Sequence, residues 1–435
     1  MAAADRVTTD RERPRPGRRA VLKGAAATAL LRLLTGGPAR AGRTGAASTG
    51  ATARLHVATF LAVDRAQIAY AIDVLRGLEL WASTIPASRE ARLAVGSGPS
   101  DADTVAAWYD SVATGADVLV APYGSPLTRV AFHVAEARRI PCIAPSAADP
   151  GLWDARRQWS VGVLEPTPTF FEGVLELMAR RPSARRSDVA LVYRNDPYSR
   201  SVMAGAARRA GALGFRRIVH HRFHDTHERA AAAGAASAAT VLGTGYQPGS
   251  PGEGFLDDAV ALARAVPRAR TSLIALGVGA ADPAFGPAAG AAAEGVVGVT
   301  GWRPYLPTPG NAAFVEAFRA RWRHDPTAHV AQGFAAGQVL QGAERIAAAR
   351  LRRSRATADG ERPVPAREAL RDALHALETE TIFGRYRVDD GGRQVGHRPA
   401  LVRWRDGRVA PLEGLPPDVP DGDEPTDAPT GKERA

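Results

Sequence analysis

Lysine is almost absent from this chain of 435 residues. Only Lys23 and Lys432 occur among its 56 basic residues, so arginine carries nearly all of the positive charge. Phosphate loops of the GxxxxGKS type, Schiff-base cofactor sites and Ser–Lys nucleophile pairs each need a lysine. The sequence therefore excludes these three kinds of site between residues 24 and 431.

Cysteine is limited to Cys142, which excludes an intrachain disulfide and a cysteine-based metal cluster. This residue lies in an apolar run at 140–143, where we expect a buried and unreactive thiol. The GxSxG pattern of hydrolases and the HExxH pattern of zinc enzymes are also missing. We therefore expect a protein that is not an enzyme and needs no cofactor.

A long apolar run is missing from the N-terminal region. The apolar residues 25–31 are ended by an arginine, whereas a membrane-spanning helix needs about 20 apolar residues. They follow an arginine pair at 18–19 and precede a small-x-small triplet at 39–41, which is the layout of a twin-arginine export signal. We expect residues 1–41 to be this signal, recognised by the twin-arginine translocase. The mature protein would lie in the periplasm or at the outer face of the cytoplasmic membrane.

The formal net charge of +11 is unevenly distributed along the chain. Residues 1–41 carry nine basic and three acidic side chains, while the proline-rich residues 413–435 carry seven acidic and two basic ones. Arginines between them are scattered, with no basic stripe interleaved with aromatic residues. We therefore expect no nucleic-acid partner, and we expect residues 413–435 to be a disordered tail.

From residue 54 onward, predicted strands alternate with predicted helices. Strands are predicted at 56–61, 92–96, 117–121, 141–144, 188–193, 217–222, 240–243 and 272–276. Alanine-rich helices separate them, and two further amphipathic helices are predicted at 311–323 and 328–349. This alternation predicts an α/β fold with two doubly wound parallel sheets.

Several motifs carry a family resemblance. Residues 381–407 contain Phe-Gly-Arg-Tyr, Gly-His and Val-Arg-Trp-Arg-Asp-Gly, and residues 121–125 read Ala-Pro-Tyr-Gly-Ser. Further matches are residues 141–150, 195–198, 282–285 and 293–295. In this order the chain resembles the type I periplasmic solute-binding proteins of ABC transporters, in the branched-chain amino acid (Leu/Ile/Val-binding-like) family. The resemblance covers residues 53–412, which makes it more specific than a single motif.

The resemblance implies two α/β lobes joined by a three-segment hinge, with a solute held between them. Lobe one would comprise residues 52–165 and 295–380, and lobe two residues 166–294 and 381–412. It also implies a function: the protein would capture an amino acid or a related small polar carboxylate or amide and deliver it to an ABC permease.

The resemblance further implies residues that contact the solute. Ser125 matches the serine that holds the ligand carboxylate in the family, and helix N-termini at a sheet edge suit such a group. The alternative is an ordinary N-cap serine of a helix that starts near Leu127. Ser146 and Ala148 follow the next strand and match backbone and threonine contacts, but Ala148 lacks the threonine hydroxyl.

Three tyrosines match aromatic residues of the family site: Tyr70, Tyr198 and Tyr246. Tyr70 and Tyr198 could instead be residues of the apolar core. The family's glutamate that pairs with the ligand ammonium would fall at residues 277–279, which contain no acid. Because an unpaired ammonium in a closed cleft is costly, either Asp282 or another acid replaces it, or the solute is not an ordinary α-amino acid.

Two other functions stay open from the sequence. The same fold could serve as a ligand-sensing module for a membrane receptor. The histidine-rich residues 220–228 could hold a metal ion in an exported hydrolase, although their spacing matches no known zinc pattern. The alternative for this segment is a histidine-rich surface loop.

Overall fold

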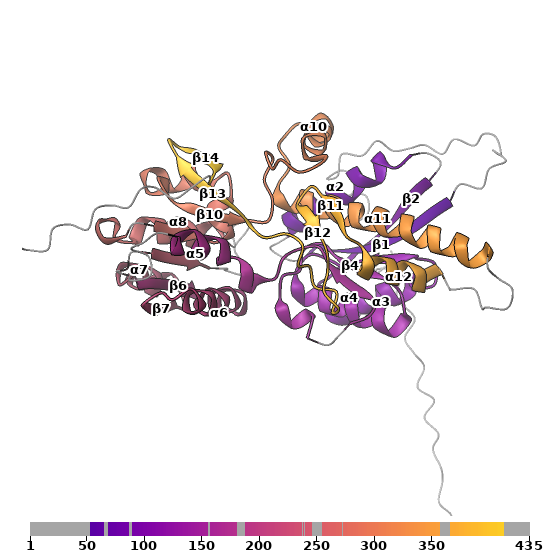
Figure 1. Ribbon diagram of the computed structural model, residues 1–435, viewed down its shortest axis with the longest axis horizontal. Helices are drawn as coiled ribbons and strands as arrows, with labels where there is room; N and C mark the ends of the chain where they lie inside the picture. The colour runs from indigo at the N-terminus through magenta and orange to yellow at the C-terminus, as the bar shows by residue number, and fades with distance from the viewer. Residues whose placement is uncertain are drawn as a thin grey trace, which may run out of the picture.

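The computed structural model describes two lobes that lie side by side and are joined by crossing segments (Figure 1). The described residues are 53–64, 68–86, 89–154, 157–180, 188–236, 238, 240–245, 255–271, 273–356 and 366–412. The predicted export signal, Tyr246 and the predicted tail lie outside them.

Lobe one is built on a five-stranded parallel sheet in the order β2-β1-β3-β4-β5. Its strands are β1 (Ala53–Ala62), β2 (Arg89–Gly98), β3 (Val118–Val120), β4 (Cys142–Ala144) and β5 (Ser160–Gly162). Its helices are α2 (Ile68–Thr84), α3 (Ala102–Val112), α4 (Ser125–Arg138), α10 (Asn311–Trp322), α11 (Ala328–Ala356) and α12 (Ala366–Ala376). Val57 packs in the core under α2 and α11, and its neighbour Ala58 packs in the core under α3 and α4. Successive strand residues point to opposite faces, so both faces of this sheet are covered by helices.

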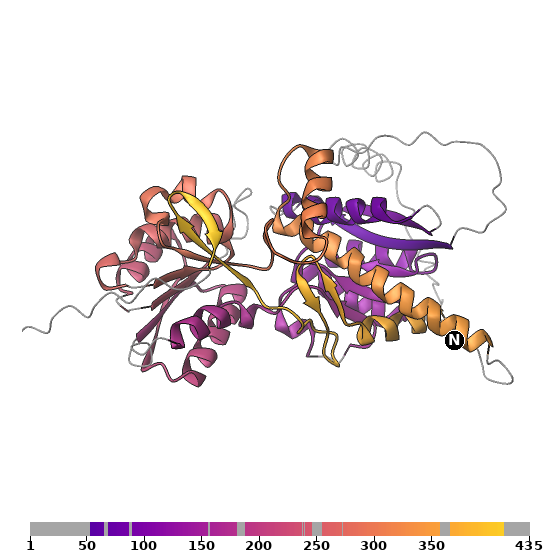
Figure 2. The ribbon, with the colours of Figure 1, turned by 45° about the horizontal axis from the view of Figure 1, so that its top comes forward.

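Helices α2 and α11 run beside each other along one face of this sheet (Figure 2). Glycines allow their backbones to approach closely. A Cβ atom at Gly77 would lie 2.0 Å from the Val330 carbonyl oxygen, and one at Gly333 would lie 1.9 Å from the Val74 carbonyl oxygen. Because no larger residue fits at these crossings, the N-terminal ends of both helices are held at the same edge of the sheet.

Lobe two is built on a seven-stranded sheet in the order β14-β13-β10-β9-β8-β6-β7. Its strands are β6 (Asp188–Arg194), β7 (Arg217–Phe223), β8 (Thr240–Thr244), β9 (Leu273–Leu276), β10 (Val297–Thr300), β13 (Ala400–Arg405) and β14 (Arg408–Pro411). Its helices are α5 (Glu172–Ala179), α6 (Pro197–Ala212), α7 (Thr226–Gly234), α8 (Leu256–Ala265) and α9 (Phe285–Ala289). Strands β6 to β10 pair in parallel, and β13 and β14 add an antiparallel edge.

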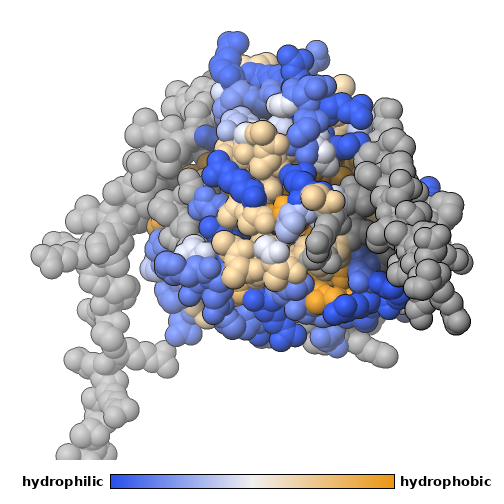
Figure 3. Space-filling view, turned by 90° about the vertical axis from the view of Figure 1, so that its left-hand side faces the viewer, coloured by the Kyte–Doolittle hydropathy of each residue, from blue (hydrophilic) through white to orange (hydrophobic). Residues whose placement is uncertain are grey.

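The predicted doubly wound fold is confirmed in both lobes. Seen from the outer end of lobe two, hydrophilic residues surround a band of weakly hydrophobic ones (Figure 3). In the part of the chain that the structure describes, no helix has both the length and the apolar character needed to cross a membrane.

The two internal lobe boundaries differ from those predicted at residues 295 and 381. Strand β10 pairs with β9 and β13, so the chain leaves lobe two only after Thr300. The hairpin of β11 (Thr379–Thr381) and β12 (Gly384–Tyr386) belongs to lobe one, because Tyr386 and Val388 are buried in the lobe-one core. An apolar strand pattern shows that a segment is buried, but it does not show in which of two cores.

Candidate functional site

The carboxyl ends of β3 and β4 and the N-terminal ends of α2 and α11 meet at one edge of the lobe-one sheet. Three of the predicted site residues lie there: Tyr70 near the start of α2, Ser125 after β3, and Ser146 after β4. In parallel α/β sheets this is the edge where ligands bind.

Ser125 is the first residue of α4, and it is not the N-cap that the alternative interpretation required. Gly124 occupies the cap position with φ of 90°, a left-handed conformation that favours glycine, and no side chain caps the helix. The Ser125 hydroxyl oxygen accepts a hydrogen bond from the Asp149 backbone N–H at 3.2 Å. Its hydroxyl hydrogen therefore remains to be donated to another acceptor.

Asp149 connects the loop after β4 to helix α4. Its carboxylate accepts a bond from Arg129 Nη2 at 2.7 Å and another from the Gly151 N–H at 2.9 Å. These contacts hold the backbone of residue 149 where it meets Ser125.

Ser146 is buried, and its hydroxyl donates to Gln332 Oε1 at 2.5 Å. Gln332 lies on α11 and is buried as well. Ala148, two residues further on, is buried against the apolar core of lobe two, and its carbonyl accepts the Thr167 N–H at 2.9 Å. The loop after β4 therefore contacts both lobes.

Tyr70, Tyr123 and His329 form a ring cluster beside these serines. The rings of Tyr70 and His329 stack with centroids 4.3 Å apart, and the Tyr123 ring meets His329 edge-on at 5.4 Å. Burial lowers the pKa of His329 to about 4, so the imidazole is neutral at pH 7. The cluster is therefore an uncharged aromatic wall.

Three residues of this edge were not predicted from the sequence: Tyr123, His329 and Gln332. Tyr123 lies inside the motif at residues 121–125, which was a usable signal. His329 lies 206 residues after Tyr123, and Gln332 follows it on the same helix. No local pattern marks either residue as a neighbour of Tyr70.

On lobe two, Tyr198 lies in the first turn of α6. Its ring packs edge-on against Phe170 at 6.2 Å and against Phe255 at 5.2 Å. Burial raises the pKa of its hydroxyl well above the ordinary value. Asp196 caps the same helix by accepting the Ser199 N–H and hydroxyl, and burial raises the pKa of its carboxyl.

Two other acids of lobe two have defined partners. Asp282 follows the short 3-10 helix η5 (Val278–Ala281) and accepts the Ala284 N–H at 2.8 Å, which starts α9. Asp258 is fully buried and binds Arg194 at 2.8 Å and Arg229 at 2.6 Å. Asp258 is thus committed to two guanidinium groups.

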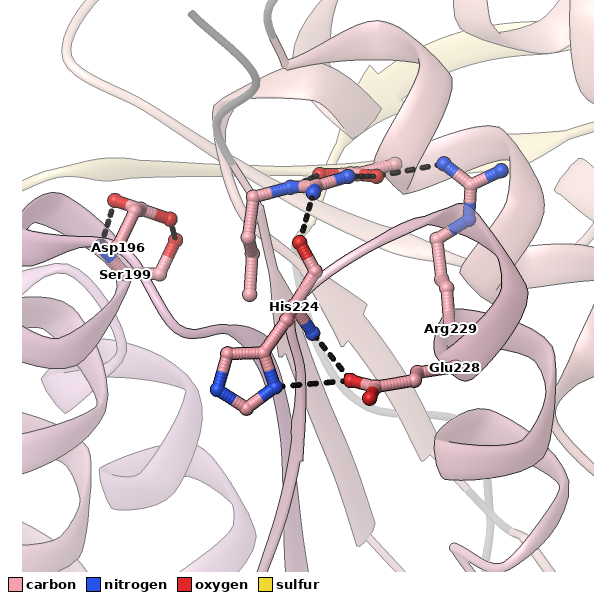
Figure 4. A network of polar contacts seen from close by, with 7 residues as sticks. Asp196, Ser199, His224, Glu228 and Arg229 are labelled. Carbon is pink, nitrogen blue, oxygen red and sulfur yellow. Dashed lines mark hydrogen bonds and ion pairs between the residues drawn. The ribbon is translucent and has the colours of Figure 1, made fainter.

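The histidines of residues 220–228 are spread over β7 and the start of α7. His220 Nδ1 lies 3.1 Å from the Tyr193 hydroxyl, and His224 pairs with Glu228 at 2.9 Å (Figure 4). Among the residues with described positions, no three His, Cys, Asp or Glu side chains come together as metal ligands. His220 and His224 are thus each engaged with a neighbouring side chain.

Comparisons with known proteins agree with this geometry. A family model described as periplasmic binding protein matches residues 69–408. No curated protein sequence matches the chain.

Three solved structures illustrate the similarity in fold. The leucine binding protein LivK from Thermotoga maritima has a TM-score of 0.64 at 17% identity, covering 83% of this chain and 99% of its own. The LivJ substrate binding protein from Streptococcus pneumoniae, in complex with isoleucine, has a TM-score of 0.62 at 15% identity, covering 82% and 97%. A solute binding protein from R. palustris, in complex with benzoate, has a TM-score of 0.61 at 18% identity, covering 83% and 96%.

Proposed function

The chain belongs to the family of periplasmic binding proteins, and from that premise we propose that it captures a small carboxylate-bearing solute between its lobes. The solute is an amino acid or a related polar carboxylate or amide, which the protein delivers to an ABC permease. Proteins of similar fold are described as binding leucine, isoleucine or benzoate, which supports a carboxylate ligand of this size.

The observation that carries this proposal is the pair of donors at Ser125. Its hydroxyl oxygen accepts the Asp149 N–H, and its hydroxyl hydrogen can be donated to a further acceptor. It stands in the first turn of α4, where backbone N–H groups lack helical acceptors and the helix dipole is positive. A carboxylate accepts both kinds of bond.

Other residues at this edge of lobe one would make the remaining contacts with the solute. The Ser146 hydroxyl donates a hydrogen bond to the side-chain carbonyl oxygen of Gln332. The side-chain N–H groups of Gln332 can then donate to the solute. The ring cluster that contains Tyr70 forms an apolar wall of the site. Ala148 packs against the apolar core of lobe two, so this edge of lobe one lies next to lobe two.

In this proposal Tyr198 and Asp282 form the opposing wall on lobe two, while Tyr246, which the family resemblance also implies, lies outside the described residues. One carboxylate oxygen of Asp282 accepts the Ala284 N–H, and the second would serve an ammonium group. The action of the protein is hinge closure. A solute that contacts both lobes binds best when they approach each other, so binding shifts the population towards the closed form.

We further propose that the protein reaches this task by export. Residues 1–41 would direct it through the twin-arginine translocase to the periplasm or the outer face of the cytoplasmic membrane, where the permease is accessible.

The test is a thermal-shift screen of amino acids, amides and aromatic acids. A ligand with a micromolar Kd at millimolar concentration adds about 4 kcal/mol to the free energy of unfolding. For any hit, Ser125→Ala should weaken binding about tenfold, because it removes one hydrogen bond to a charged group. Ser111→Ala is the matched control: its exposed hydroxyl donates to the Trp108 carbonyl within α3. Unchanged affinity in the Ser125 variant would remove Ser125 from the site, and no hit in the whole panel would contradict the proposed ligand class.

A further inference from the structure

A cavity of about 840 Å³ lies in lobe one and shares no lining residue with the edge that holds Ser125. Its walls come from three segments: the one between the 3-10 helix η1 (Pro150–Leu152) and β5, the second half of α12, and the loop at residues 389–393 after β12. This loop and α12 lie side by side (Figure 1), and a Cβ atom at Gly392 would lie 3.4 Å from the His375 ring. Cavities of this volume hold small molecules in other proteins.

Arg157 contributes a buried positive charge to this cavity. The residue is only 7% exposed, although it is an arginine. Its Nε donates to the Leu152 carbonyl oxygen at 2.9 Å, and its guanidinium carbon lies 5.4 Å from the centroid of the Phe132 ring. These two contacts hold the guanidinium group in one place at the wall of the cavity.

The Arg157 charge has no carboxylate partner within the described residues, and no side chain or carbonyl there accepts from its two Nη nitrogens. Burial lowers the pKa of Arg157, and the negative charge of Glu136 offsets this only in part. The Glu136 carboxylate instead accepts the Trp159 N–H at 2.9 Å and the Gln158 N–H at 3.3 Å. A buried charge without a partner is unfavourable, so an anionic group beside Arg157 would be stabilised.

The other two arginines that line the cavity are neutralised by neighbouring acids. Arg371 binds Asp372 at 2.6 Å, and Arg393 binds Asp389 at 2.7 Å. The Asp389 carboxylate is held further by the Gly391 N–H at 3.1 Å. These two pairs add no net charge to the walls.

Two lining acids remain, Asp154 and Asp390. Both are exposed, and neither forms an ion pair in the part of the chain that the structure describes. Since Arg157 is buried, the cavity has a positive group in its wall and negative groups where it meets solvent. The exposed acids would repel an anion of charge −2 and attract a cationic group.

We propose that this cavity is a second binding site, which takes a small zwitterion with its carboxylate on Arg157 and its ammonium group near Asp154 and Asp390. The planar guanidinium can donate parallel N–H bonds from its two Nη nitrogens to the two oxygens of a carboxylate. Because the cavity and the Ser125 edge have no residue in common, the inference does not depend on the proposed function.

The experiment is calorimetric titration of the full chain with 4-aminobutyrate and 6-aminohexanoate, two zwitterions that differ in charge separation. Butyrate and hexanoate are the matched probes that lack the ammonium group. We expect at least one zwitterion to bind about fivefold more tightly than its matched carboxylate, which is the effect of an exposed ion pair at the upper end of the usual range.

Three variants locate the two ends of the probe. Arg157→Gln should weaken the zwitterion and the carboxylate at least about tenfold, because it removes hydrogen bonds between two charged groups. Asp390→Asn, at an exposed position, should weaken the zwitterion about threefold and leave the carboxylate unchanged. The control Arg216→Gln alters an exposed arginine of lobe two that pairs with Asp188, and it should keep the native affinities.

Four results would overturn the proposal: no binding of either zwitterion, equal affinity for a zwitterion and its carboxylate, native affinity in Arg157→Gln, or native zwitterion affinity in Asp390→Asn. A probe that loses affinity in Ser125→Ala and keeps it in Arg157→Gln binds at the proposed solute site, which would overturn the second site and support the first. If Arg157→Gln does not fold, the Asp390→Asn comparison still decides, because it leaves the buried residue intact.

Discussion

His329 makes the stability of lobe one sensitive to acid. Burial in the ring cluster lowers its pKa from 6.5 to about 4, so the folded state resists protonation. Below pH 6.5 the unfolded chain binds a proton that the folded chain does not. The free energy of unfolding is therefore unaffected by His329 above pH 6.5, and it decreases progressively as the pH falls from 6.5 towards 4.

The magnitude follows from the shift. Each pKa unit corresponds to 1.36 kcal/mol, so the full loss between pH 6.5 and 4 is about 3 kcal/mol. At pH 5, where the unfolded histidine is almost fully protonated, the loss relative to pH 7 is about 2 kcal/mol.

The assay is urea unfolding at pH 7 and pH 5 for the native chain and for His329→Gln. Groups other than His329 that respond to pH are common to both proteins, so their effects cancel in the difference. The native chain should lose about 2 kcal/mol more than the variant over this interval. A parallel loss in both proteins would refute the assignment of a neutral imidazole at this position.

Three further predictions concern the core and the buried charges. Asp258→Asn leaves two guanidinium groups without their buried carboxylate and should cost about 3–5 kcal/mol in urea unfolding; a cost below about 1 kcal/mol would contradict the buried ion triad. Gly286→Ala places a Cβ atom 1.9 Å from the Trp404 ring and should destabilise lobe two by about 1–3 kcal/mol, with a changed tryptophan emission as its signature. Cys142 should resist a thiol reagent in the native state and react in denaturant, because it is fully buried and its pKa is raised; rapid native-state labelling would show that the strand opens.

Sequence motifs predicted some residues of the proposed site but not others. Ser125 and Ser146 were predicted from the family resemblance, which matched each to a residue in the loop after a strand. In a parallel sheet the loops after the strands share one edge. Tyr123 could have been added from the motif that contains it. Gln332 and His329 could not, because only the close crossing of α2 and α11 at Gly77 and Gly333 brings them to that edge.

The amino-acid sequence by itself determined the α/β alternation and the two largely parallel sheets, and it excluded lysine-dependent sites in the body of the chain, an intrachain disulfide and a cysteine-based metal cluster. These properties depend only on amino-acid composition and on the spacing of residues that are close in the chain. The tertiary structure alone decided that β10 joins lobe two, that the β11–β12 hairpin joins lobe one, and that Arg157 and Asp390 line one cavity. Such contacts join residues far apart in the chain, and their pairing is selected by the packing of whole sheets and helices, to which no local pattern corresponds.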